Sequence, residues 1–238
     1  MRCPIKESLL SAALLCALGS TGHAQAPTPT PNVPSGESTR TLRTVSNFVT
    51  VTDQTLRAPT PEDWLIHRGN YQAWGYSPLD QINKANVKTL QLVWARAMEP
   101  GINEATPLIY NGVMYLGNPG DVIQAIDAAN GDLLWEYRHP LPPATSFRSN
   151  HGQRKRSIAL YGDHIYIVTW DNIVVALEAR TGKVAWQSNR GGDFYVSNSS
   201  GPIVANGVVV AGSTCQAGPG GESSRCARAP CPSWHRDR

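Results

Sequence analysis

Short stretches in which apolar and polar residues alternate recur between residues 105 and 212, and turn residues separate them. This pattern predicts short β-strands joined by tight turns. Asn130-Gly131 is predicted to be a hairpin turn, because both residue types tolerate positive φ, and Thr181-Gly182 takes the same place one unit later. The predicted strands of the first unit cover residues 105–110, 113–116, 122–127 and a last stretch that ends at Trp135.

These strands form a repeated unit. Tyr115 and Trp135 recur as Tyr166 and Trp186, each 51 positions later (166 − 115 and 186 − 135), with no gap inside the unit. A third copy begins at Gly201 and its pattern ends after residue 212. Four antiparallel strands every ~40–50 residues are typical of β-propeller blades. The sequence therefore predicts an all-β, partial β-propeller of about two full four-stranded blades plus part of a third, with indole rings wedged between neighbouring sheets.

The region before the repeats predicts a short helical lead-in segment over residues 52–73. Thr60 fits the N-cap of a helix, because Pro61 follows in the first turn and two acidic residues come next. Two more elements are predicted before the first unit, a helical turn at residues 83–90 and a strand at residues 92–98.

The N-terminus predicts a secretory signal peptide over residues 1–24. Arg2 and Lys6 supply positive charge, residues 9–18 are apolar, and the small-residue ending Gly-His-Ala suits cleavage. Because about 20 apolar residues are needed to span a bilayer, we expect no transmembrane segment after cleavage, and an uncleaved N-terminal anchor is the alternative. The expected localisation is periplasmic.

The rest of the chain divides by composition. Residues 25–44 are rich in Pro and Thr and predict an extended linker, so ordered structure is expected to begin near Val45. Residues 45–214 carry the incomplete set of blades. Residues 215–238 are rich in Gly, Cys, Arg and Pro and lack the β pattern. This tail is either the product of a frameshift or premature stop, or a genuine disordered tail, and a break inside a repeat favours disruption.

Composition excludes several other classes of protein. The net charge is +3 and no Lys/Arg stripe stands out, so nucleic acid is not an expected partner. No cysteine lies between residues 45 and 214, so the core is not a disulfide scaffold. His67, His139 and His151 lack the spacing of a zinc site and are expected to be surface or loop histidines.

Several motifs together resemble the PQQ-dependent (quinoprotein) alcohol dehydrogenases over residues 45–214. Ala-x-Asp-Ala-x-x-Gly-x-x-x-Trp, at residues 125–135, resembles the tryptophan-docking motif of that family. The motif also occurs in non-enzymatic propellers of the outer-membrane assembly lipoprotein type, so a protein-interaction scaffold is the alternative function. The flanking sequences favour the enzymes, and they are Asp63-Trp64, residues 76–83, residues 103–108 and residues 120–125.

The resemblance implies an eight-bladed propeller that holds PQQ with Ca²⁺ or a lanthanide ion in its central channel. It also implies an alcohol substrate, hydride transfer to PQQ, and a cytochrome c or quinone as electron acceptor. A chain with two units and part of a third does not enclose such a channel. We therefore expect marginal folding, no useful PQQ binding and no activity from this fragment alone.

Three residues match cofactor-binding positions of that family. Glu104 matches a glutamate that contacts PQQ, and Arg156 matches an arginine that pairs with a PQQ carboxylate, for which the guanidinium fork is suited. Ser197 lies where the family has a cofactor-contacting hydroxyl, although Ser199 and Ser200 compete for that place. The alternatives are a solvated loop carboxylate for Glu104 and an exposed basic run at residues 154–156 for Arg156. No catalytic or metal-ligating residue is assigned, and the adjacent cysteine pair that many members carry before the arginine is absent.

Overall fold

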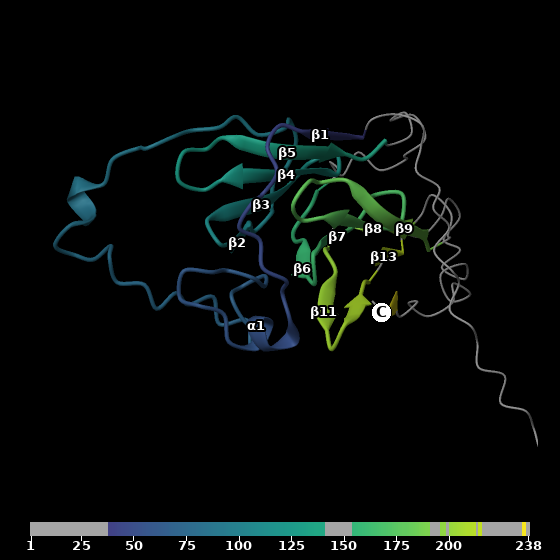
Figure 1. The fold of residues 1–238 in the computed structure, drawn as a ribbon, viewed down its shortest axis with the longest axis horizontal. Coiled ribbons are helices and arrows are strands. Elements are labelled where there is room, and N and C mark those ends of the chain that lie inside the picture. The colour runs from purple at the N-terminus through teal and green to yellow at the C-terminus, as the bar shows by residue number, and fades with distance from the viewer. Residues whose placement is uncertain are drawn as a thin grey trace, which may run out of the picture.

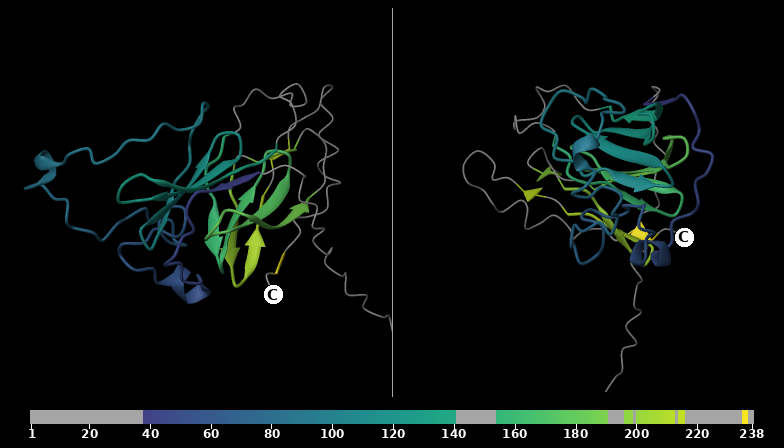
Figure 2. Two further views of the ribbon diagram at one scale, coloured as in Figure 1. Left: turned by 45° about the horizontal axis from the view of Figure 1, so that its top comes forward. Right: turned by 90° about the vertical axis from the view of Figure 1, so that its left-hand side faces the viewer.

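The structure is a computed structural model that describes residues 38–140, 154–190, 196–198, 200–212, 214–215 and 235–236. Its strands form antiparallel sheets that stand side by side (Figures 1 and 2). The first sheet consists, from its inner to its outer edge, of β2 (Leu108–Tyr110), β3 (Val113–Asn118), β4 (Val122–Asp127), β5 (Leu133–Arg138) and β1 (Thr39–Thr41).

The second sheet repeats the first without the added outer strand. It consists of β6 (Ala159–Tyr161), β7 (His164–Val168), β8 (Ile173–Glu178) and β9 (Val184–Asn189). Part of a third sheet and a separate strand pair follow, with β11 (Ile203–Ala205), β12 (Val208–Val210) and β14 (His235–Arg236) in the sheet and β10 (Val196–Ser197) and β13 (Thr214–Cys215) in the pair. The predicted fold class, an all-β partial propeller, is confirmed.

The sequence repeat is also a repeat of strand register. Ala125 pairs with Trp135 across β4 and β5, and Ala176 pairs with Trp186 across β8 and β9. In both sheets the register shifts immediately after that alanine. The matching irregularity shows that the two units are built alike down to the position of one bulge.

The two Asn-Gly turns of the first sheet have the same sequence but differ in length. Asn111 and Gly112 both have positive φ, of 48° and 76°, so they form the two-residue hairpin between β2 and β3. At the predicted Asn130-Gly131 hairpin only Gly131 has positive φ, and residues 128–132 together connect β4 to β5. The predicted hairpin is present, since β4 and β5 pair antiparallel, but a wider loop closes it, in which the Asp127 carbonyl accepts a hydrogen bond from the Gly131 amide.

Successive sheets share buried cores. One apolar cluster spans the first and second sheets and includes Tyr115 and Trp135 from the first and Ile165 and Leu177 from the second. Another joins the second sheet to the third through residues such as Val174 and Val209. Because the second sheet is buried on both faces, its stability depends on its neighbours, as in other repeat architectures.

Indole rings lock neighbouring units together, as predicted. The Trp94 ring lies on Gly131 and its Nε1 donates a hydrogen bond to the Ala128 carbonyl at 3.1 Å. One unit later, Trp135 lies on Gly182 and donates to the Ala179 carbonyl at 3.0 Å. Residues near Trp94 therefore occupy the position that β5 occupies in the next unit.

The lead-in segment differs from its prediction. Its helix, α1 (Asp53–Arg57), begins after the N-cap Thr52 rather than after Thr60. The Thr60 hydroxyl instead donates to the Asp63 carboxylate, at 2.9 Å, within a turn. A helix cannot continue from there, because the backbone of Trp64 pairs with that of Ile109 at the inner edge of the first sheet.

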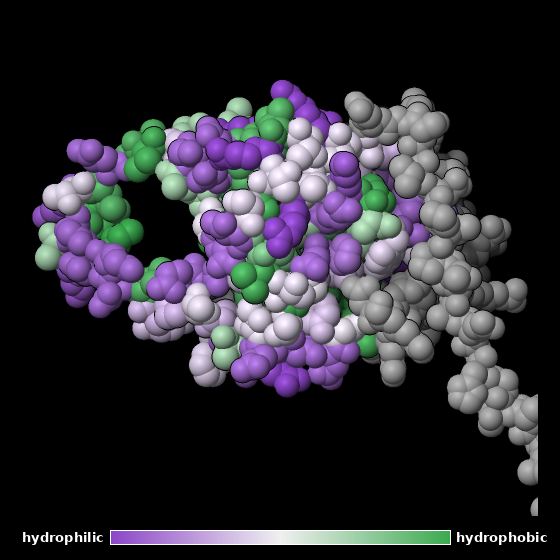
Figure 3. All heavy atoms as spheres, viewed as in Figure 1, coloured by the Kyte–Doolittle hydropathy of each residue, from purple (hydrophilic) through white to green (hydrophobic). Residues whose placement is uncertain are grey.

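Two further predictions about this region have opposite outcomes. The helical turn at residues 83–90 is confirmed as a 3₁₀ turn, η1 (Val87–Thr89). The strand predicted at residues 92–98 is wrong, since that stretch runs extended without pairing to any described strand. It belongs to a loop that projects from the sheets (Figures 1 and 3), on which Leu92 and Val93 are 83% and 80% exposed.

Ordered structure begins before Val45, contrary to the prediction, because β1 pairs with β5 within the segment expected to be a linker. Most of the predicted linker, the whole of the predicted signal peptide and most of the predicted tail lie outside the described residues. Among the described residues, no helix has the length and apolar character required to cross a bilayer.

Candidate functional site

Glu104 and Arg156 meet at the inner edge of the propeller. Each lies shortly before the innermost strand of its sheet, β2 for Glu104 and β6 for Arg156. The Arg156 Nε lies 2.7 Å from Glu104 Oε2, and the Arg156 carbonyl accepts a hydrogen bond from the Thr106 amide at 3.1 Å. The side chains are 46% and 32% exposed, so a ligand in the channel could reach them. The sequence predicted a cofactor contact for each of these two residues on its own, and the structure shows that they are neighbours.

A second arginine joins this pair. Arg154 Nη1 lies 3.5 Å from the other oxygen of the Glu104 carboxylate, Oε1. Two guanidinium groups therefore converge on one carboxylate at the inner edge. Such a group of partly exposed arginines suits a ligand that carries carboxylates.

Lys155, between the two arginines, faces the opposite way and is buried. Its side chain is 1% exposed, and its Nζ lies 2.5 Å from Asp121 Oδ1 and 2.5 Å from the Val168 carbonyl oxygen. The interpretation of residues 154–156 as one exposed basic run is therefore wrong for its middle member. A run of three basic residues carries no sign of which one is buried, and the partner Asp121 lies in the preceding unit.

Asp121 ties the first sheet to the second. It follows β3 in the turn to β4, has a φ of 55° and is 1% exposed. Its Oδ2 accepts a hydrogen bond from the Trp170 amide at 2.5 Å, in the corresponding turn of the second sheet. The buried carboxylate is therefore satisfied by one ammonium group and one backbone amide.

His139 lies outside the strands, directly after β5, as a loop histidine would, but it is buried beside this pair and not at the surface. Its Nδ1 lies 2.9 Å from the Tyr137 hydroxyl and its Nε2 lies 2.9 Å from Asp171 Oδ1. Burial opposes ionisation of Asp171, but the hydrogen bonds from His139 and Thr169 outweigh it and hold the pKa of that carboxyl below its ordinary value. These side chains form a second polar link between the first two sheets.

Ser197, the third predicted residue, lies in β10, where its backbone pairs with that of Thr214. Its side chain is outside the described part of the structure, so its contact with a cofactor stays a prediction. The next residue, Asn198, is buried and donates to the Asn172 side chain at 3.1 Å. Among the described residues, no group of three His, Cys, Asp or Glu side chains could hold a metal ion.

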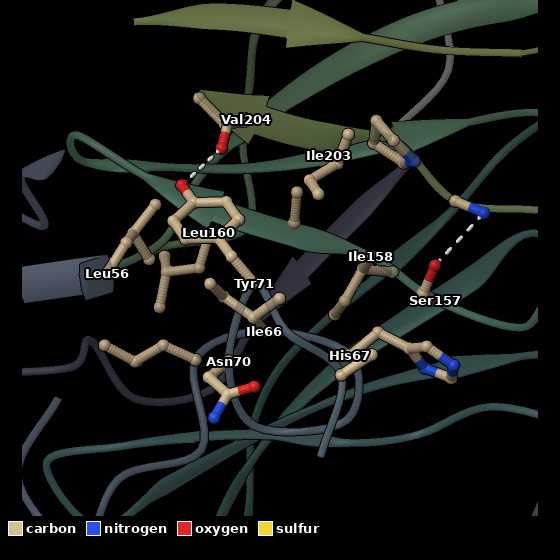
Figure 4. A pocket seen from close by; sticks show the side chains of 15 residues that line it. Leu56, Ile66, His67, Asn70, Tyr71, Ser157, Ile158, Leu160, Ile203 and Val204 are labelled. Atoms are coloured by element: carbon tan, nitrogen blue, oxygen red, sulfur yellow. Dashed lines mark hydrogen bonds between the residues drawn. The ribbon is translucent and has the colours of Figure 1, made fainter. Parts of the chain in front are cut away.

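A cavity of about 270 Å³ opens beside these residues (Figure 4). Its wall is mostly apolar and comes from the inner strands β6 and β11 and from the lead-in segment. The Tyr71 hydroxyl donates to the Val204 carbonyl at 2.7 Å across one side, and the Ser157 hydroxyl accepts from the Gly201 amide at the other. Ser157 lines this cavity and follows Arg156 in the sequence, but neither Glu104 nor Arg156 lines it.

Comparison with known proteins identifies the class. The family model described as "Glucose/ethanol/alcohol dehydrogenase, beta-propeller domain", of the PQQ type, matches residues 64–227. The chain belongs to this family of PQQ β-propellers.

Individual relatives agree. The chain is 36% identical over 159 residues to the quinohemoprotein alcohol dehydrogenase of Comamonas testosteroni, which covers 65% of this chain and 22% of the relative. It is 36% identical over 160 residues to the dehydrogenase subunit of the alcohol dehydrogenase (quinone) of Gluconobacter oxydans, which covers 64% of this chain and 21% of the relative. The chain thus spans about one fifth of the length of these curated relatives.

Solved structures show the same architecture. The crystal structure of the Comamonas testosteroni enzyme superposes with a TM-score of 0.58 at 33% identity, over 68% of this chain and 25% of that one. A europium-containing methanol dehydrogenase superposes with a TM-score of 0.62 at 25% identity, over 68% of this chain and 29% of that one.

Proposed function

We propose that this chain forms the first blades of a periplasmic PQQ-dependent alcohol dehydrogenase and supplies part of its cofactor site, and that the fragment alone is inactive. The observation that carries the proposal is the Glu104–Arg156 ion pair at the inner edges of two neighbouring sheets. Partly exposed arginines that converge on one carboxylate at this edge favour a site for an anionic ligand over a scaffold surface. The names of the relatives, among them a 1-butanol dehydrogenase (cytochrome c), support an alcohol substrate and a cytochrome c or quinone acceptor.

The described residues fit a cofactor that carries carboxylates. Arg154 and Arg156 present two partly exposed guanidinium groups beside the carboxylate of Glu104, and the planar guanidinium fork matches the geometry of a bound carboxylate. Arg156 would bind and orient the cofactor, while Glu104 holds the guanidinium in place and excludes other orientations. When bound, PQQ supplies the redox chemistry by accepting hydride from the alcohol. The Ca²⁺ or lanthanide ion of the family would take its ligands from outside the described residues, and Ser197 is proposed as a further cofactor contact.

Two experiments test this proposal. In the first, the purified chain is assayed for alcohol-dependent dye reduction with PQQ and Ca²⁺, and we expect none, because two sheets and part of a third do not surround a channel. Sustained turnover would show that the fragment is active after all.

In the second experiment, residues 64–212 replace the matching stretch of the Comamonas testosteroni enzyme. We expect PQQ-dependent turnover from this graft, and at least a tenfold rise in the PQQ dissociation constant for Arg156→Met. The matched control is Arg96→Met in the same graft, which removes an exposed arginine of the projecting loop and should leave the PQQ dissociation constant unchanged. A graft that folds with the parent's thermal midpoint but binds PQQ equally well with Arg156→Met would overturn the proposed role of the pair.

A further inference from the structure

Side chains alternate along the backbone here, so Lys155 lies on one side and its neighbours Arg154 and Arg156 lie on the other. In an extended stretch, successive side chains point to opposite faces, so burying the middle residue turns its neighbours outward together. Lys155 points between the first and second sheets, while Arg154 and Arg156 both reach Glu104 at the inner edge. The direction of the two arginines is thus linked to the burial of one lysine.

The lysine is held from both sheets at once. Its Nζ binds Asp121 in the first sheet and the Val168 carbonyl at the end of β7 in the second, each at 2.5 Å. Its aliphatic stem packs over Gly117, where an added Cβ would lie 3.2 Å from the Lys155 Cγ. Because the ammonium group binds one partner in each sheet, the side chain is fixed, and the backbone at residue 155 has little freedom to rotate.

We propose that the Lys155–Asp121 pair is a positioning device that aims Arg156, and Arg154 with it, at the cofactor site. Lys155 and Asp121 touch no ligand in this role and act only through the arginines. The inference rests on the proposed function for its ligand, PQQ, but the aim of the arginines can be tested without any cofactor.

The test uses the full chain and the reactivity of its arginines. Phenylglyoxal modifies accessible guanidinium groups, and mass spectrometry gives the rate at Arg154 and Arg156. Asp121→Asn keeps a residue that tolerates positive φ while removing the charge. We expect it to raise the modification rate of both arginines at least threefold. The control is Asp127→Asn in the same sheet, whose partner Arg43 is exposed, and it should leave both rates unchanged.

A double variant separates aim from stability. Asp121→Asn leaves a buried ammonium without its counter-ion, which lowers the thermal midpoint, and adding Lys155→Met removes that charge and should restore much of the midpoint. We expect the arginine reactivity to stay raised in the double variant, because methionine cannot bind the Val168 carbonyl. Reactivity that returns to the parent value together with the midpoint, or that never rises, would show that the pair only stabilises the fold.

The graft into the Comamonas testosteroni enzyme links the device to the cofactor. There, Asp121→Asn should raise the PQQ dissociation constant at least fivefold, and Asp127→Asn should not. If the parent graft binds no PQQ, the proposed function fails while the arginine reactivity still decides this inference. If the graft binds PQQ and Asp121→Asn changes neither affinity nor reactivity, the inference alone fails.

Discussion

The indole ring of Trp135 lies directly against the backbone of Gly182, so β5 of the first sheet is docked on the loop between β8 and β9 of the second. Trp135 is fully buried, and its Nε1 donates to the Ala179 carbonyl at 3.0 Å. The φ of Gly182 is 74°, and a Cβ at this position would clash with the ring. Glycine is required here for two separate reasons, its backbone conformation and the close approach of the indole.

Alanine substitutions should separate those two reasons. Gly112 has a nearly equal φ of 76°, but a Cβ there would have nothing within 4 Å, so Gly112→Ala should cost only the left-handed strain, about 1–2 kcal/mol. Gly182→Ala adds the overlap with Trp135, and we expect a further loss of about 1–3 kcal/mol. Urea unfolding of the full chain measures both. Equal losses would contradict a role for the indole contact.

The repeat could be predicted from sequence because the same contact recurs at each junction between units. Alanine, glycine and tryptophan recur at fixed spacing, since the tryptophan of one unit docks on the glycine of the next, so the sequence marked both Trp135 and Gly182. The strand predicted at residues 92–98 failed for the opposite reason. Alternation there is real, but a strand also needs a partner, and no described strand supplies one.

The site was predictable only in part. Glu104 and Arg156 were identified by resemblance, and their contact follows from the neighbouring positions of β2 and β6. Lys155, Asp121 and His139 were missed, because each is buried by a residue of the other sheet, and a pairing between sheets leaves no periodic signal in either segment. The φ of 55° at Asp121, by contrast, belongs to the local turn with Gly120, whose φ is 77°, and it recurs at the equivalent Asn172, whose φ is 68°.

Arg180 fastens residues 45–48 to the second sheet. Its guanidinium donates to the carbonyls of Val45, Ser46 and Phe48 and lies 5.6 Å from the centre of the Phe48 ring. Arg180→Ala should release this segment and raise its cleavage by thermolysin several-fold in limited proteolysis, because cleavage follows local opening. The control is Lys183→Ala, which removes an exposed cation from the same loop between β8 and β9. Similar cleavage in both variants would show that Arg180 does not hold the segment.

The lowered pKa of Asp171 predicts that the stability of the fold decreases at acid pH. Its pKa in the folded chain lies below the ordinary value, because burial, which raises the pKa, is outweighed by the hydrogen bonds from His139 and Thr169. A lowered carboxyl pKa contributes stability that is fully present above the unfolded value, about 3.9, and is lost as the pH falls through the folded value. Below about pH 4, Asp171→Asn should therefore lose less stability than the parent does. Denaturant midpoints between pH 6 and pH 3 measure this, with the exposed Asp132→Asn as control, and parallel curves for parent and Asp171→Asn would contradict the assignment.

The two equivalent tryptophans should differ in what they contribute to stability. Trp135 is fully buried between two sheets, whereas Trp186 is only partly buried, with its ring 5.9 Å from that of Tyr166. Trp135→Phe removes a hydrogen bond and ring volume from a closed core, so we expect a loss of about 2–4 kcal/mol in the free energy of unfolding. Trp186→Phe should cost about half as much or less, because fewer of its contacts are withdrawn from solvent. Urea midpoints of the two single variants decide the matter. Equal losses would show that Trp186 is docked as tightly as Trp135 and that the third sheet buries it to the same extent.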